Sequence, residues 1–301
     1  MDGRHASAPL ALCGIFALTL GLSACGNSSL SSGEATASAP VASETKAAAL
    51  AALVPDKIKS AGKIVVGVDA SYAPNEFLAS DGTTVKGMDV DLFNAVGQTL
   101  GLKVDWQPAK FDSIITGVQG GKYDVGVSSF TINPQRKQQV NMVSYFNAGT
   151  QWATAPGNPK KINTDSPCGI NVAVQKGTVQ QEQDLPVKVA KCKAAGKPIN
   201  TLVYTGQDQV TAAVATGKAD AMLADSPVVS YAVKQSGGKI EAVGSIYDSA
   251  PYGVVVDKSD TAFAKAIAGA FKALDTSGGY EKILAGWGNQ AGAVSNFAVN
   301  P

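Results

Sequence analysis

Short apolar runs alternate with amphipathic stretches along the chain from residue 48 onward. Residues 63–68 (K-I-V-V-G-V) are almost continuously apolar, which is typical of a strand buried on both faces. Helical spacing of apolar residues predicts one helix from Asp89 and another from Phe111-Asp112, with Asp89 and Asp112 as their expected caps. Further strands are predicted at 103–107 and 123–127. This strand–helix–strand order predicts a parallel sheet with right-handed crossovers.

The second half of the chain repeats the pattern. Strands are predicted at 140–145, 170–174, 201–204, 221–224 and 240–243, and helices at 207–216, 227–235, 262–274 and 280–287. Residues 151–155 and 253–256 are extended and are expected to cross between two lobes. A chain of 301 residues also favours two lobes over one core. We therefore expect an α/β fold with a helix-flanked central sheet in each lobe, the first at 48–150 and 253–301 and the second at 151–252.

A four-residue motif occurs twice, each time after a predicted helix and before a predicted strand. It is G-K-Y-D at 121–124 and G-K-A-D at 217–220. Five residues after the first aspartate comes Ser129, and five after the second comes Asp225. Ligands in open α/β sheets bind at the carboxyl ends of strands. The repeat therefore makes Ser129 and Asp225 equivalent positions on two strand ends.

The polar residues that follow these strand ends have complementary charges. Ser129, Thr131 and Arg136 follow the first strand, and Arg offers a planar fork of donors that suits a carboxylate. Asp225 offers a carboxylate at the second. If the lobes face each other, a small molecule with a carboxylate and an ammonium on one carbon fits between them. The alternative is an ordinary polar turn with a solvated Arg136.

The first 47 residues predict export and a lipid anchor. Residues 10–22 are mostly apolar and too short for a stable span, and L-S-A-C at 22–25 resembles the lipobox of bacterial lipoproteins. We expect a signal peptide at 1–24, lipidation of Cys25, and a flexible Ser/Ala/Thr-rich tether at 25–47 on the extracytoplasmic face of the cell membrane. The alternative is a plain secretory signal.

Composition excludes several kinds of chemistry. The sole histidine, His5, lies in the predicted signal peptide, so a His-dependent nucleophilic triad or His-ligated metal has no residue to use. Net charge is +1 without basic clusters, so no nucleic-acid partner is expected. Cys168 and Cys192 are expected to form a disulfide in an exported protein. We expect a monomer without cofactor or metal.

Between residues 63 and 287 the motifs together resemble one family. V-G-V-D-A-S-Y-A-P, G-M-D-V-D-L, S-S-F-T-I-N-P-Q-R, V-Q-K-G-T and A-D-S-P stand in the order found in bacterial solute-binding proteins of the polar amino-acid class, family 3. The resemblance implies a type II periplasmic-binding-protein fold, with ligand in a cleft between lobes that close over it. It also implies an ABC permease and its ATPase subunits as partners.

The resemblance implies a role for each candidate site residue. Arg136 matches the clamp on the ligand carboxylate, and Asp225 the acceptor of its ammonium. The remaining expected ligand-binding residues are Asp69, Tyr72, Phe111, Ser129, Phe130, Thr131 and Thr178. Tyr72 and Phe111 match an aromatic pair around the ligand side chain. Val179 and Gln180 depart from the family pattern, in which a second hydroxyl is common.

The ligand side chain is predicted less firmly than its head group. Asp69 matches an acid that meets the distal end of the ligand, although it could instead cap a turn. Asp69 and Glu76, together with the aromatic pair, favour a cationic side chain such as arginine, lysine or ornithine. A neutral side chain such as glutamine also fits. A dehydratase-like enzyme with Glu76 or Asp69 as general acid, and a ligand-sensing module, are the alternative functions.

Overall fold

The computed structural model describes residues 47–301. The predicted signal peptide, the lipidated Cys25 and nearly all of the tether lie outside the described residues, so these remain predictions. Within residues 47–301, no helix is both long enough and apolar enough to span a bilayer.

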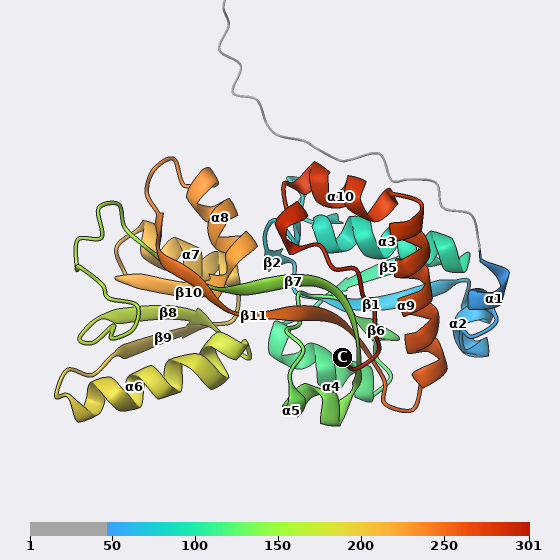
Figure 1. Cartoon of the computed structure of the whole chain (residues 1–301), viewed down its shortest axis with the longest axis horizontal. Helices are drawn as coiled ribbons and strands as arrows, with labels where there is room; N and C mark the ends of the chain where they lie inside the picture. Colours follow the sequence, from blue (N-terminus) through green and yellow to red (C-terminus); the bar gives the residue numbers. More distant parts are fainter. Residues whose placement is uncertain (1–46) are drawn as a thin grey trace, which may run out of the picture. The chain divides into compact units, whose positions relative to one another are not determined.

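One mixed sheet of eight strands runs through both lobes, in the order β5-β1-β6-β11-β7-β10-β8-β9. The two long strands β7 (Asn141–Thr154) and β11 (Glu241–Val256) are antiparallel to each other and pass from one lobe to the other (Figure 1). Each unites two stretches that the sequence predicts as separate strands. The two crossing strands are confirmed, but they join the lobes into one sheet. The predicted lobe boundaries near 150 and 252 fall inside these strands.

The remaining elements fall into two groups around the crossing strands. The first lobe contains β1 (Lys63–Val68), β5 (Lys103–Pro108), β6 (Val125–Gly126), α1 (Ala48–Ala51), α2 (Asp56–Ala61), α3 (Met88–Leu100), α4 (Phe111–Gln119), α5 (Pro134–Gln139), α9 (Thr261–Thr276), α10 (Gly279–Trp287), the 3-10 turn η2 (Gln290–Gly292) and a small sheet of β2 (Ser71–Tyr72), β3 (Glu76–Leu78) and β4 (Val85–Lys86). The second lobe contains β8 (Asn171–Gln175), β9 (Asn200–Tyr204), β10 (Ala221–Asp225), the π-helix η1 (Gln180–Asp184), α6 (Leu185–Ala194), α7 (Gln207–Ala215) and α8 (Ser226–Gln235).

Helices cover both faces of the sheet in each lobe, because alternate residues of a strand point to opposite faces. In β8, Val172 and Val174 pack in one cluster with Leu185 of α6. Ala173, between them, packs in another cluster with Val210 of α7. Figure 1 shows α6 on one side of these strands and α7 and α8 on the other. The buried strands therefore need apolar residues at nearly every position, as the sequence pattern predicts.

Both predicted aspartate caps are wrong. Helix α3 begins after Gly87, whose φ is 141°. Only glycine fits at this position, because a Cβ would collide with the main-chain oxygen of Asn75. Asp89 lies in the first turn and is completely buried, with its side chain turned to other partners. Helix α4 begins after Lys110, and its Asp112 forms an ion pair with Lys176 of the second lobe.

A disulfide joins Cys168 to Cys192, with Cα atoms 5.1 Å apart, as the cysteine count predicts. It connects the loop before β8 to helix α6. Cys192 is fully buried in the cluster on that face of the second lobe. The bond therefore fixes α6 to the sheet on which it packs.

Candidate ligand-binding site

The two G-K-x-D motifs support their strands in the same way. The Asp124 side chain accepts a hydrogen bond at 2.8 Å from the main-chain N–H of Val65 in β1. The Asp220 side chain accepts one at 2.8 Å from the N–H of Asn171 at the start of β8. Each motif therefore ties the start of its own strand to the neighbouring parallel strand. This common anchoring fixes where the two strand ends point.

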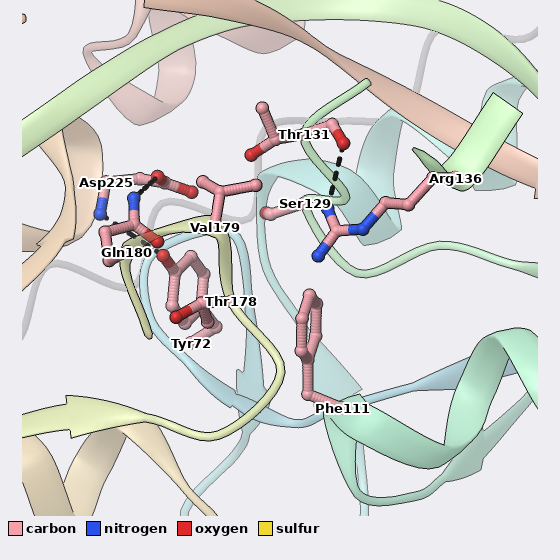
Figure 2. Close-up of a pocket in the computed structure, with 9 residues that line it drawn as sticks. All are labelled: Tyr72, Phe111, Ser129, Thr131, Arg136, Thr178, Val179, Gln180 and Asp225. Atoms are coloured by element: carbon pink, nitrogen blue, oxygen red, sulfur yellow. Dashed lines mark hydrogen bonds between the residues drawn. The ribbon is translucent and has the colours of Figure 1, made fainter. Parts of the chain in front are cut away.

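A small cavity lies between the lobes at these strand ends (Figure 2). Nine residues line it: Tyr72, Phe111, Ser129, Thr131, Arg136, Thr178, Val179, Gln180 and Asp225. Seven of them are candidate residues from the sequence. The structure therefore brings residues that are more than 150 positions apart in the chain to one enclosed space. Figure 2 shows Arg136 and Asp225 on opposite sides of it.

The Arg136 guanidinium is held in place from both lobes. Helix α5 begins at Pro134, and the Asn133 side chain accepts a hydrogen bond from the Arg136 N–H at 2.8 Å. Nη1 donates to the Thr131 carbonyl at 2.8 Å, and Nη2 donates to the Gly177 carbonyl of the second lobe at 2.9 Å. Arg136 is only 6% exposed. Burial lowers its pKa to about 10, so the guanidinium is still charged at neutral pH.

Two stacked aromatic rings form the floor beneath this cation. The rings of Phe111 and Phe130 are stacked with centroids 4.5 Å apart. The Arg136 guanidinium carbon lies 5.6 Å from the first centroid and 5.4 Å from the second, within the range of a cation–π interaction. Phe130 does not line the cavity, although the sequence predicts it as a ligand contact. It supports Phe111 and the guanidinium from below.

Asp225 presents a fully engaged carboxylate at the opposite wall. One oxygen accepts a hydrogen bond from Gln180 Nε2 at 2.7 Å, and the other accepts one from the Tyr252 hydroxyl at 2.7 Å. Its main-chain N–H donates to the Tyr72 hydroxyl at 3.2 Å. Asp225 is 5% exposed, and this burial raises the pKa of its carboxyl despite the hydrogen bonds. Such a desolvated acid gains from a nearby cation.

Asp69 does not line the cavity, contrary to its predicted role at the distal end of the ligand. One of its oxygens accepts from the Ser71 hydroxyl at 2.6 Å. The other accepts from the Phe111 N–H at 2.9 Å and from Gln175 Nε2 at 3.0 Å. Asp69 therefore caps α4 from outside the helix and bridges to the second lobe. The alternative of a capping residue describes its place in the structure better.

The second-lobe wall contains two residues that the sequence analysis did not select. Val179 and Gln180 line the cavity after Thr178, where the chain enters the π-helix η1. The Thr178 hydroxyl donates to the Gln175 carbonyl at 2.8 Å. Gln180 is buried and bonds both Asp225 and the Thr150 hydroxyl. The sequence signal for Gln180 is its position two residues after the predicted site residue Thr178, although the family pattern commonly has a hydroxyl here.

The two-lobed α/β fold, with an arginine and an aspartate on opposite walls of a buried cavity between the lobes, defines a type II periplasmic binding protein. The chain belongs to the bacterial extracellular solute-binding proteins, family 3, whose family model matches residues 64–290. Members of this family bind amino acids outside the cytoplasm and deliver them to ABC permeases. The family predicted from the sequence motifs is thereby confirmed.

Several relatives have named ligands. The chain is 37% identical over 251 residues to the arginine-binding protein ArgT of Corynebacterium glutamicum, covering 83% of this chain and 82% of the relative. It is 29% identical to the lysine/arginine/ornithine-binding periplasmic protein of Escherichia coli, covering 72% and 84%. A solved ancestral arginine-binding protein bound to arginine superposes with a TM-score of 0.70 at 29% identity, covering 75% of this chain and 98% of the other.

Proposed function

We propose that this protein is the substrate-binding component of an ABC importer and captures an L-amino acid with a cationic side chain, arginine foremost. The observation that carries the proposal is the pair of buried, opposite charges on facing walls of one cavity. Arg136 provides two-pronged donors for an α-carboxylate, and Asp225 provides an acceptor for an α-ammonium. A zwitterion satisfies both groups at once, and neither a simple acid nor a simple amine does so.

The preference for a cationic side chain has weaker support from the cavity than from the named ligands of similar proteins. Phe111 lines the cavity, and an aromatic face favours a cation near it. Asp69 lies behind Phe111, bonded to its N–H. The named ligands of two similar proteins are arginine, or lysine, arginine and ornithine. These observations support arginine, lysine and ornithine ahead of neutral amino acids.

The dehydratase-like alternative receives no such support. Glu76 and Asp69, the two acids that it would use, are not among the residues that line the cavity. Asp225 is the sole carboxyl in that lining, and both its oxygens already accept hydrogen bonds. A general acid must reach the leaving group of its substrate. We therefore assign this cavity to binding, with a lipid anchor at Cys25 holding the protein to the membrane as a monomer.

A ligand panel tests the proposal directly. The protein with its signal peptide removed is melted with each common L-amino acid and ornithine, and positive ligands are titrated by calorimetry. L-arginine, L-lysine or L-ornithine should raise the melting midpoint, because a ligand far above its Kd stabilises the folded state. Agmatine, which is arginine without the carboxylate, is the matched control and should give little shift. No shift with any amino acid contradicts the proposal.

A further inference from the structure

Two acidic side chains lie behind the first-lobe wall of the cavity, outside the residues that line it. Glu76 belongs to the short strand β3, and Asp89 to the first turn of α3. Both have 0% exposure. They converge on one side chain, because the Ser129 Oγ lies 3.3 Å from Glu76 Oε2 and 3.3 Å from Asp89 Oδ2. One hydroxyl has a single proton to donate, so it cannot satisfy both acids.

The contacts of the two acids differ, and the difference locates the negative charge. Asp89 Oδ2 accepts hydrogen bonds from the Ser129 N–H at 3.1 Å and from the Tyr145 hydroxyl. Glu76 faces the hydroxyls of Ser128 and Ser129, each at 3.3 Å, and the side chain of Asp89, and no main-chain N–H donates to it in the described residues. Among residues 47–301, neither acid forms an ion pair with a lysine or arginine. Asp89 is therefore the better-stabilised anion.

Two neighbouring carboxylates without a cation cannot both be charged in a buried site. Burial and the neighbouring Asp89 raise the pKa of Glu76 well above its usual range, and burial raises the pKa of Asp89 to about 6. The negative charge of Asp69 raises the pKa of Glu76 further. Tyr72 and Tyr145 are the other titratable groups that interact electrostatically with the pair. At neutral pH, Glu76 is the group that keeps a proton.

The main chain of Ser129 has an unfavourable conformation, which its hydrogen bonds must stabilise. Its φ is 52°, in the left-handed region that residues other than glycine rarely adopt. Its hydroxyl accepts from Asn75 Nδ2 at 2.9 Å and faces the acid pair, while the residue itself lines the cavity. The Asp89 carboxylate holds the N–H of the same residue. The acid pair thus forms hydrogen bonds with both the main chain and the side chain of Ser129.

We propose that Glu76 and Asp89 hold one proton between them and act as positioning residues that fix the left-handed Ser129 in the wall of the ligand cavity. The ligand half of this inference rests on the proposed function, while the shared proton does not. The protonated Glu76 and the ionised Asp89 form one buried unit with a single negative charge.

The shared proton has a direct spectroscopic test on the ligand-free protein. At pH 7, infrared spectra with glutamate carboxyl carbon labelled should show the C=O stretch of a protonated carboxylic acid. Glu76→Gln should remove that band, and Glu281→Gln, a change to an exposed acid, should leave it intact. A wild-type spectrum without the band, or a band that survives Glu76→Gln, overturns the proposal whether or not any amino acid binds.

The positioning role is tested by L-arginine titration of matched variants. Glu76→Gln keeps a neutral donor and should change Kd by less than about threefold, whereas Glu76→Ala should weaken binding about tenfold or more. Adding Ser129→Gly to Glu76→Ala should recover much of that loss, because glycine adopts the left-handed conformation without support. Equal weakening by the Gln and Ala variants, or no recovery with glycine, contradicts the role. Failure of the wild type to bind any amino acid would count against the proposed function instead.

Folding stability gives an independent readout of the same pair. A carboxyl whose pKa is raised by folding binds its proton more tightly in the native state than in the unfolded state. The Asp89 contribution to stability is therefore greatest below the unfolded pKa near 4 and is lost as pH rises through about 6, while the Glu76 contribution also falls from pH 4 and continues to fall above 6, because its pKa is raised further. Urea unfolding from pH 4 to 7 should show this loss in the wild type and a flatter profile in Glu76→Gln. Identical profiles contradict the proposal.

Discussion

The two G-K-x-D units have the same scaffold and different strand ends. Asp124 and Asp220 each bond the N–H of the neighbouring parallel strand at 2.8 Å, and each has an exposed lysine at about 4 Å, Lys57 at 4.0 Å and Lys160 at 3.8 Å. In both units the aspartate's own N–H also bonds back to that strand. This shared part fixes the geometry of the strands without contributing to the cavity.

The two units differ in the segment that follows each aspartate. In the second lobe, β10 continues for five residues and ends on Asp225 at the cavity. In the first lobe, β6 ends after two residues, and the chain turns through Ser129 before α5 presents Arg136. One lobe therefore places an anion at its strand end and the other a cation. The comparison teaches that the repeat builds two similar walls, and that the residues after it give them complementary charge.

Asp225→Asn should have the largest effect on ligand affinity. The amide keeps the shape of the side chain but removes the negative charge that the ligand ammonium requires. Removing one partner of a buried charge pair costs several kcal/mol, so Kd for L-arginine should rise at least about 100-fold. The free protein should be equally stable or more stable, because burial of an ionised Asp225 is unfavourable. Calorimetry and urea unfolding measure the two effects.

The outcome that would break the comparison is specific. If Asp225→Asn binds L-arginine within about threefold of the wild type, the second-lobe strand end does not supply the charge that completes the site. A large loss of stability in the free variant would instead show that Asp225 chiefly organises Gln180 and Tyr252. Either result would separate the strand end from the role that the comparison gives it.

Asp124→Ala and Asp220→Ala should have matched effects on stability. Each change leaves the N–H of a neighbouring strand without its charged acceptor. In the native protein the Asp124 side chain is 13% exposed and the Asp220 side chain 17% exposed. Each should lower the free energy of unfolding by about 2 kcal/mol, the range for a hydrogen bond to a charged group. Affinity for L-arginine should change by less than about threefold for both. Urea unfolding with calorimetry checks the pair.

A marked difference between these two variants would sharpen the comparison. If one aspartate matters for folding and the other does not, the units are similar only in sequence. If either variant loses affinity as strongly as Asp225→Asn, the anchoring of the strand cannot be separated from ligand binding. In that case the aspartate motif would belong to the site itself.

The parts of the fold that depend on local pattern could be predicted from the sequence. In β8, Val172 and Ala173 face helices on opposite sides of the sheet, and the apolar pattern of the strand predicts this layered arrangement. The repeated motif predicts where the two strands end. The family motifs then select most of the residues that line the cavity. Seven of nine candidate ligand-binding residues reach it because each follows a strand end or a helix start that the pattern locates.

The failures share a physical cause, which is hydrogen bonding over long sequence separations. Asp69 is drawn away from the cavity by the Phe111 N–H and by Gln175, which are 42 and 106 residues away in the chain. Asp89 matches a cap in its local sequence but bonds Ser129 and Tyr145 across the lobe. Neither set of partners leaves a local signal. A polar residue near a helix start can therefore be located from sequence, but its partner cannot.

The ion pair between Lys176 and Asp112 should have the smallest effect, and it tests whether contacts between the lobes contribute to affinity. The two charged atoms are 2.7 Å apart, with side chains 56% and 29% exposed. The pair joins the second lobe to the start of α4. Exposed pairs are weak and are screened by salt. Lys176→Gln should therefore raise Kd for L-arginine by less than about fivefold at low salt, with a smaller change at high salt.

The chain offers a closely matched control for this last prediction. Lys63 and Asp105 are also 2.7 Å apart, with side chains 48% and 31% exposed, but both lie on adjacent strands of the first lobe. Lys63→Gln removes an equivalent charge without touching a contact between lobes, so it should leave Kd unchanged at either salt concentration. If both variants change Kd equally, the effect reflects net charge on the protein. If only Lys176→Gln does so, the exposed contact between the lobes favours the ligand-bound state.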